Sequence, residues 1–231
     1  MSEQNFAQMK KNTVRSDHQL DGTEEISFEK KDSHGLRVLF LGNSMTLHGI
    51  KEDIGWHGCW GMAASTKEKD YVHRMMDMIC EKQPDASFRI CQAADWERNY
   101  KQGNDTWPLF QEAHDFDADI IIMRLVENCC GNDFDQELFE QQLESFLDYL
   151  NPSKAAKIIM TTGFWRHPGD EGIRALAKRN NWPLVELGDL GEDDAMKAIG
   201  LFEHNGVANH PGDLGMQKMA ERIFALLEDE L

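Results

Sequence analysis

The stretch Arg37-Val-Leu-Phe-Leu-Gly-Asn-Ser44 decides the expected fold, because a short apolar run ends there in a polar turn that presents a hydroxyl group. Residues 38–41 have the length and apolar character of a buried strand, and Gly42-Asn43 is a turn-forming pair. Ser44 is therefore expected at the carboxyl end of a strand, where ligands bind in open α/β sheets. Three roles fit this placement: a nucleophile beside N–H groups that bind an oxyanion, part of a phosphate-binding turn, or a helix cap.

Strand and helix patterns alternate along the rest of the chain. Further strands are expected at residues 88–91, 119–125, 157–160 and 184–187. Apolar residues at helical spacing predict helices over residues 72–80, 138–150, around 173–176 and over 214–227. Asp213 is placed to cap the last of these helices. The alternation predicts an α/β protein with a parallel sheet of about five strands, covered by helices on both faces.

The composition fits one globular domain. The chain has 231 residues, of which 41% are hydrophobic and 28% are charged. Residues 36–231 are expected to form the domain, and residues 1–35 are a polar leader with one candidate strand at Glu25–Glu29. The sequence leaves open whether this leader is disordered or packs along the domain.

Charge and the lack of targeting signals exclude several classes of partner. The formal net charge of −17 repels phosphate backbones and anionic lipids, so neither nucleic acid nor a membrane is an expected partner. The five cysteines have no CxxC spacing and the histidines share no helical face with carboxylates, so neither disulfides nor a metal site is expected. The amino terminus lacks an apolar signal region and no apolar run approaches membrane-spanning length, which predicts a cytoplasmic protein.

Two further polar groups are expected at the same edge of the sheet as Ser44. Asn128 follows the strand at 119–125, and its amide can donate hydrogen bonds over the crevice. His210 lies in Asn209-His-Pro-Gly-Asp213, a loop directly before the last helix. Because functional loops gather at the carboxyl edge of a parallel sheet, the three side chains are expected to lie close together.

These three segments resemble, in order and spacing, sequence blocks of the SGNH (GDSL-like) hydrolases. The blocks are Gly42-Asn-Ser44, Asn128 and His210-Pro-Gly-Asp-Leu-Gly-Met216, and the resemblance covers residues 36–231. It implies a flavodoxin-like three-layer α/β/α sandwich, with Ser44 as nucleophile and His210 as general base. It also implies that Asn128 and the Ser44 N–H donate to an oxyanion, with no cofactor. Substrates of this family are esters or thioesters, very often acetyl groups on sugars.

The chain departs from the family pattern at three places. At one of them Asn43 stands where many members have an aspartate, a change that keeps a turn-forming side chain. Val207 stands where the family has an aspartate that orients the histidine. A backbone carbonyl, Glu203 or Asp189 are the candidates to take over that role, and a Ser-His dyad is the working hypothesis. The stretch 90–98 also lacks the glycine whose N–H completes the oxyanion hole, although the backbone N–H of Ala94 or a neighbour is available in principle.

Aromatic and charged residues close to these blocks are the predicted substrate contacts. They are Trp56, Trp60, Trp96, Glu97, Arg124 and Trp165. Two alternatives stay open. The tryptophans at 56 and 60 can instead bury a long loop. Arg124 can instead form a salt bridge with Glu97 or Glu127.

The sequence therefore predicts a serine esterase that acts on a small ester such as an O-acetylated carbohydrate, by two-step acyl transfer without metal or cofactor. Two other functions stay open. A catalytically weak protein of the same fold can bind an ester or carbohydrate, which Val207 makes plausible. A flavodoxin-like protein can bind a phosphorylated ligand at residues 42–46, but such a site gives no reason for His210 to lie over Ser44.

Overall fold

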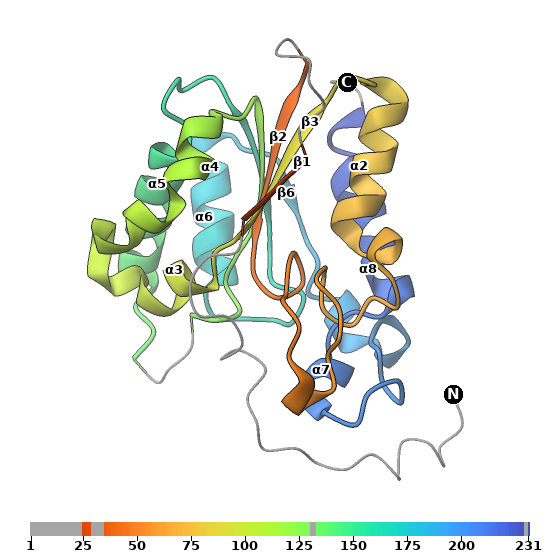
Figure 1. Ribbon diagram of the computed structural model, residues 1–231. Helices are drawn as coiled ribbons and strands as arrows, with labels where there is room; N and C mark the ends of the chain where they lie inside the picture. The colour runs from red at the N-terminus through yellow and green to blue at the C-terminus, as the bar shows by residue number, and fades with distance from the viewer. Residues whose placement is uncertain (1–24, 29–34, 130–132, 229–230) are drawn as a thin grey trace.

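Six strands form a single sheet at the centre of the molecule (Figure 1). The computed structural model describes residues 25–28, 35–129, 133–228 and 231. The strands, in the spatial order β1-β3-β2-β4-β5-β6, are β1 Glu25–Phe28, β2 Arg37–Gly42, β3 Ser87–Gln92, β4 Ile120–Arg124, β5 Lys157–Thr161 and β6 Leu184–Val185. Strands β2 to β6 are parallel, as predicted, and β1 adds an antiparallel edge beside β3. The order of the parallel strands is that of flavodoxin-like folds.

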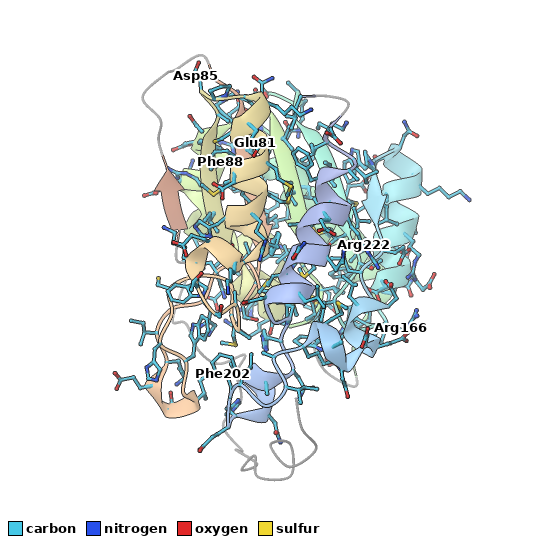
Figure 2. All side chains as sticks on the ribbon, turned by 90° about the vertical axis from the view of Figure 1, so that its right-hand side faces the viewer. Glu81, Asp85, Phe88, Arg166, Phe202 and Arg222 are labelled. Atoms are coloured by element: carbon cyan, nitrogen blue, oxygen red, sulfur yellow. The ribbon has the colours of Figure 1, made fainter. Side chains whose placement is uncertain are left out.

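Helices cover both faces of the sheet (Figure 1). On one face lie α2 Tyr71–Lys82 and α8 Asp213–Phe224, which pack side by side in the view of Figure 2. On the other face lie α3 Ala94–Asn99, α4 Gln111–Phe116, α5 Gln136–Tyr149 and α6 Asp170–Asn180. Short 3₁₀ segments are η1 Glu52–Ile54, η2 Lys67–Lys69, η3 Tyr100–Phe110, η4 Leu190–Glu192 and η5 Asp194–Met196. The predicted three-layer α/β/α fold is confirmed.

Strand β2 shows why the central strands are continuously apolar. Val38 and Phe40 pack into the core beneath α2 and α8, whereas Leu39 and Leu41 pack into the core beneath α5. All four side chains are fully buried. A strand with helices on both faces has no solvent side, so the polar alternation of a surface strand is absent.

Two features differ from the sequence-based expectation, and the candidate strand of the leader is confirmed. Between β3 and β4 the chain forms α3, η3 and α4, which carry no clear apolar period and were not predicted. Asp213 does not cap α8, because Gly212 is the capping position and the Asp213 carboxylate instead accepts hydrogen bonds from Ser65 and Lys69. The candidate strand of the leader is present as β1, and the other leader residues up to 24 lie outside the described part of the chain.

Two loops at the carboxyl edge of the sheet pack against each other and form a small lobe, which we define as residues 43–65 and 196–210. They lie below the sheet in Figure 1, and the second loop contains α7 Asn205–Ala208. The lobe has its own buried core of Ile54, Trp56, Met62, Ala63, Ala198 and Val207, with Phe202 packed against it between the two loops (Figure 2). No helix in the described ranges is long and apolar enough to span a membrane.

Candidate active site

Ser44 stands at the turn that follows β2. The backbone N–H groups of Thr46 and Leu47 both donate to the Asn43 carbonyl, which closes the turn directly after the strand. Gly42 is required by close packing, because a Cβ atom at this position would lie 1.9 Å from the Thr46 hydroxyl oxygen. That hydroxyl is itself held by the buried Tyr71 hydroxyl at 2.6 Å. The close packing at Gly42 and the contact between Thr46 and Tyr71 therefore hold the turn on which Ser44 lies.

His210 meets Ser44 across the lobe. Its Nε2 atom lies 2.9 Å from Ser44 Oγ, and its Nδ1 atom lies 2.6 Å from the Gly206 carbonyl oxygen. A carbonyl only accepts, so Nδ1 carries the proton and Nε2 is free to accept one from the serine hydroxyl. Burial lowers the pKa of His210 to about 3, so the imidazole is neutral at physiological pH.

No carboxylate among the described residues is hydrogen-bonded to His210. Asp189 forms a two-pronged ion pair with Arg222, with oxygen–nitrogen distances of 2.6 and 2.7 Å. Glu203 has an exposed side chain. Of the three candidates to orient the histidine, the structure therefore shows the backbone carbonyl, and this carbonyl belongs to Gly206.

Val207 faces the core of the lobe and not the histidine. Its side chain is fully buried. Its carbonyl accepts the main-chain N–H of His210 at 3.0 Å, and the Ala198 N–H donates to the His210 carbonyl at 2.9 Å. The position of the family aspartate is thus used for packing, and the backbone of His210 is held on both sides.

Asn128 is linked to the turn that carries Ser44 through one buried carboxylate. Its Nδ2 atom donates to Glu97 Oε2 at 2.6 Å, and Asn43 Nδ2 donates to Glu97 Oε1 at 3.2 Å. Glu97 is fully buried at the start of α3. An amide nitrogen carries two protons, so Asn128 keeps a second N–H for a ligand.

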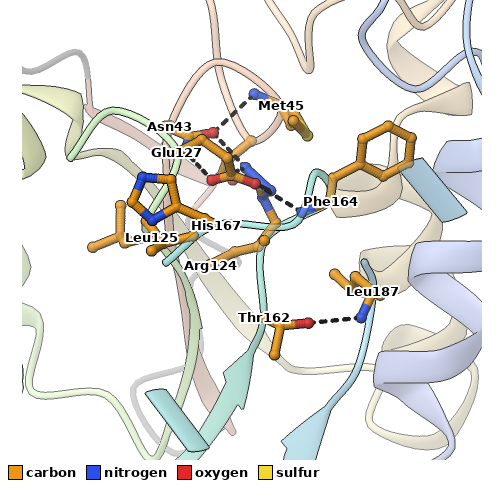
Figure 3. A network of polar contacts seen from close by, with 12 residues as sticks. Asn43, Met45, Arg124, Leu125, Glu127, Thr162, Phe164, His167 and Leu187 are labelled. Atoms are coloured by element: carbon orange, nitrogen blue, oxygen red, sulfur yellow. Dashed lines mark hydrogen bonds and ion pairs between the residues drawn. The ribbon is translucent and has the colours of Figure 1, made fainter. Parts of the chain in front are cut away.

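Arg124 is the centre of a buried network at the end of β4 (Figure 3). It donates to Glu127 at 2.7 and 3.1 Å and to Asn43 Oδ1 at 2.5 Å. Glu127 also accepts from Asn43 Nδ2 at 2.7 Å and from the Phe164 N–H at 2.9 Å. The predicted substrate contacts Glu97 and Arg124 are fully buried, so the structure corrects this expectation: both support the site from beneath, and the salt bridge is with Glu127.

The four tryptophans that were predicted to contact a substrate have different environments. Trp96 is fully buried and stacks on Phe146 with ring centroids 5.0 Å apart, so it contacts the core and not a substrate. Trp56 is only 2% exposed in the lobe core, as the loop-burial alternative expected. Trp60 is partly buried beside it. Trp165 is partly exposed and its ring lies perpendicular to that of His210, 5.1 Å between centroids, which makes it the tryptophan best placed to meet a ligand.

The N–H groups near Ser44 differ in their availability. The Ala94 N–H donates to the Gln92 side chain at 3.2 Å, so it is not the free donor that the sequence suggested. The Ser44 N–H has no protein acceptor within the described residues. Among the groups predicted to bind an oxyanion, the Ser44 N–H and one N–H of Asn128 Nδ2 are thus left without an acceptor in the described part of the chain.

Sequence reasoning missed two groups that shape the site. Gly206 acts through its carbonyl, and a backbone acceptor leaves no signature in residue types. Asn43 bridges Arg124 and two carboxylates, and its only signal was the asparagine that replaces the aspartate of many SGNH hydrolases.

Comparison with known proteins identifies the fold. No protein-family model matches the chain, and no curated protein matches its sequence. An active-site mutant of a family two carbohydrate esterase from Clostridium thermocellum matches with a TM-score of 0.57 at 15% identity, over 84% of this chain and 63% of that one. A candidate GDSL-like lipase from Parabacteroides merdae matches with a TM-score of 0.56 at 16% identity, over 83% of this chain and 94% of that one.

A two-domain esterase active on acetylated mannans matches with a TM-score of 0.54 at 15% identity, over 84% of this chain. The matched region is 50% of that esterase, so the chain spans about half its length. At 15% to 16% sequence identity, these structural matches show a shared fold. The chain has the fold of the SGNH hydrolases, and the predicted resemblance is confirmed at that level.

An aspartate at position 207 is expected to destabilise the lobe instead of completing a triad. Val207→Asp would place a carboxylate without an ion-pair partner in an apolar core. We expect the free energy of unfolding to fall by about 3 kcal/mol or more, measured by urea denaturation. Val207→Ala is the matched control, because it removes the same contacts without adding charge. An aspartate variant as stable as wild type and with a higher kcat would contradict this account.

The exposed carboxylates near the histidine loop are expected to have little influence on turnover. Glu203→Gln and Asp189→Asn should each change kcat by less than about threefold, whereas loss of a triad carboxylate costs about 10⁴-fold in a serine protease. Steady-state kinetics of both variants test this, with melting temperatures as a control because Asp189 pairs with Arg222. A loss of several thousandfold in either variant would identify an acid that acts on His210.

Proposed function

We propose that this protein is a serine ester hydrolase in which Ser44 and His210 carry out two-step acyl transfer. The observation that carries the proposal is the 2.9 Å contact between Ser44 Oγ and His210 Nε2, with Nδ1 of the same ring held by a carbonyl. This tautomer is the one that accepts a proton from a serine hydroxyl. A phosphate-binding turn would not require such a histidine.

The reaction follows from these atoms. Ser44 Oγ attacks the ester carbonyl carbon as its proton passes to His210 Nε2. The tetrahedral intermediate expels the alcohol, which takes the proton from Nε2, and an acyl-enzyme remains. Water then attacks the acyl carbon and gives its proton to Nε2. The serine recovers that proton when the acid leaves.

Two N–H groups supply the stabilisation of the negative charge. In the tetrahedral intermediate the carbonyl oxygen becomes an oxyanion, which we expect the Ser44 N–H and Asn128 Nδ2 to bind. Neither donor has to reorient as the charge develops, because the turn holds Ser44 and the Glu97 contact holds the Asn128 amide. The neutral state of His210 before attack agrees with the low pKa that burial gives it.

The substrate class that fits best is a small O-acetylated carbohydrate. One matched structure is an esterase active on acetylated mannans, and another is a family two carbohydrate esterase. The partly exposed Trp165 beside His210 offers an apolar wall to a substrate. The net charge of −17 disfavours anionic esters. A cytoplasmic location, and the lack of nucleic-acid and membrane partners, stay predictions of the sequence.

Removal of either member of the dyad is expected to abolish ester hydrolysis. Ser44→Ala and His210→Ala should each lower kcat for a short aryl acetate by about 10³-fold or more, and the double variant should lose little more, because the two residues act as one unit. Ser145→Ala is a matched control on the exposed side of α5. Wild-type turnover in a contaminant-free Ser44→Ala preparation would overturn the proposal, and an inactive wild-type protein would favour the binding function.

Asn128→Ala is expected to act on the transition state. Loss of an oxyanion donor should lower kcat by about 10²–10³-fold with a smaller change in KM. Steady-state kinetics on aryl acetate separate the two constants. An effect on KM alone would make Asn128 a substrate-binding residue.

A further inference from the structure

We propose that Glu97 is a positioning residue: its buried carboxylate holds the Asn128 amide with a nitrogen directed at the reacting carbonyl. The inference rests on the esterase function proposed above and names a group that controls its oxyanion site. Glu97 lies at the start of α3, on a different element from Ser44, Asn128 and His210.

The Glu97 carboxylate is the acceptor in each of its hydrogen bonds. Oε1 accepts from the Val126 N–H at 2.5 Å, from the Asn43 amide at 3.2 Å and from the Asn128 backbone N–H at 3.4 Å. Oε2 accepts from Asn128 Nδ2 at 2.6 Å. An ionised carboxylate has acceptors only, so it satisfies every one of these donors at once. The hydrogen bonds to Glu97 therefore favour its charged form.

Because the ionised carboxylate only accepts, it fixes the orientation of the Asn128 amide. An asparagine amide has an oxygen on one side and a nitrogen on the other, and the two ends are similar in shape. If the Asn128 amide turned over, its oxygen would face the carboxylate oxygen of Glu97, and the charge-assisted hydrogen bond would become a repulsion. Glu97 thus selects the orientation in which the amide nitrogen, with one N–H still unused, is available to an oxyanion.

Burial and one neighbouring carboxylate oppose the ionisation of Glu97. Burial, and then the nearby Glu127 carboxylate, raise the pKa of Glu97 to about 7, while hydrogen bonds from Asn128 and Asn43 and the charge of Arg124 lower it. The other titratable groups around this network are His167 in the loop after β5, Asp170 at the start of α6, and Asp95 with Arg98 on α3 itself. Glu97 therefore changes its protonation state near neutral pH.

Protonation of Glu97 has separate consequences for activity and for stability. The protonated acid presents an O–H to a set of donors, so Asn128 loses its fixed orientation as the pH falls through about 7. A pKa raised in the folded state contributes stability below the unfolded value near 4.5, and this contribution is lost as pH rises through about 7. Mild acid should thus reduce turnover without weakening this part of the fold.

The wild-type pH profile is the first test. We expect kcat/KM for a short aryl acetate to rise with pH through a midpoint near 7, although the pKa of His210 is about 3. The melting temperature, measured at the same pH values, should not fall on the acid side of that midpoint. A profile that is flat between pH 5 and 8 would contradict the proposal.

Glu97→Gln is the second test. The glutamine offers one acceptor and one donor to a set of donors, so we expect kcat to fall by about 10²-fold with little change in KM, and the limb near pH 7 to disappear. Asp95→Asn is the matched control, because it makes the same charge change two positions earlier on α3, where the aspartate pairs with Arg98. Its kcat and pH profile should match wild type.

A double-mutant cycle separates positioning from a general structural role. If Glu97 acts through Asn128, then Glu97→Gln should cost little in a protein that already carries Asn128→Ala. Losses that multiply would overturn the proposal, as would a Glu97→Gln variant with the wild-type kcat and pH profile.

Nuclear magnetic resonance gives a readout that is independent of activity and of the variants. In ¹⁵N-labelled wild-type protein the Asn128 side-chain amide signals should shift with a midpoint near pH 7. Signals that do not titrate there would overturn the role of Glu97 even if the esterase is active. If no ester is hydrolysed, the proposed function fails, and the amide titration still decides whether Glu97 controls Asn128.

Discussion

The burial of one guanidinium group, that of Arg124, constrains the ends of three neighbouring strands at the carboxyl edge of the sheet. The side chain is fully buried at the end of the central strand β4, where an unpaired charge would be very costly. Glu127 neutralises it, and Asn43 accepts its remaining short hydrogen bond. Because Glu127 also accepts the Phe164 N–H, the ends of β2, β4 and β5 are tied to a single cation.

This constraint explains the asparagine at position 43. Asn43 gives its oxygen to Arg124 and its nitrogen to the carboxylates of Glu97 and Glu127. An aspartate in the same place would set a third carboxylate beside two others and lose both donated hydrogen bonds. The departure from the commoner Gly-Asp-Ser pattern is thus coupled to Arg124, Glu97 and Glu127, which many residues of chain separate from the turn.

Position along the chain was enough to predict the sheet and the meeting of Ser44 with His210. Strands buried on both faces are continuous apolar runs, and polar groups after such strands share one edge. Environments that depend on distant partners could not be predicted in this way. Trp96 was expected at the substrate because it follows β3. In the structure it lies in the core, stacked on Phe146, which is fifty positions later in the chain. The Gly206 carbonyl is a backbone group, so no residue type announced it.

In the proposed mechanism, a triad aspartate would have two tasks: it would orient His210 and compensate the charge of the imidazolium. The structure replaces these two tasks unequally. Orientation is supplied by the lobe: the Gly206 carbonyl holds Nδ1, the Val207 carbonyl and the Ala198 N–H hold the backbone of His210, and Trp165 packs on the ring. Charge compensation is weaker, since a carbonyl is a dipole and not an anion, and burial disfavours the imidazolium that forms during attack. In the proposed mechanism, a larger share of the transition-state stabilisation would then come from the oxyanion side. On that side the buried Glu97 carboxylate accepts a hydrogen bond from the Asn128 amide. The charge absent from the histidine loop is thus found behind the proposed oxyanion donor, where we expect it to act by orientation.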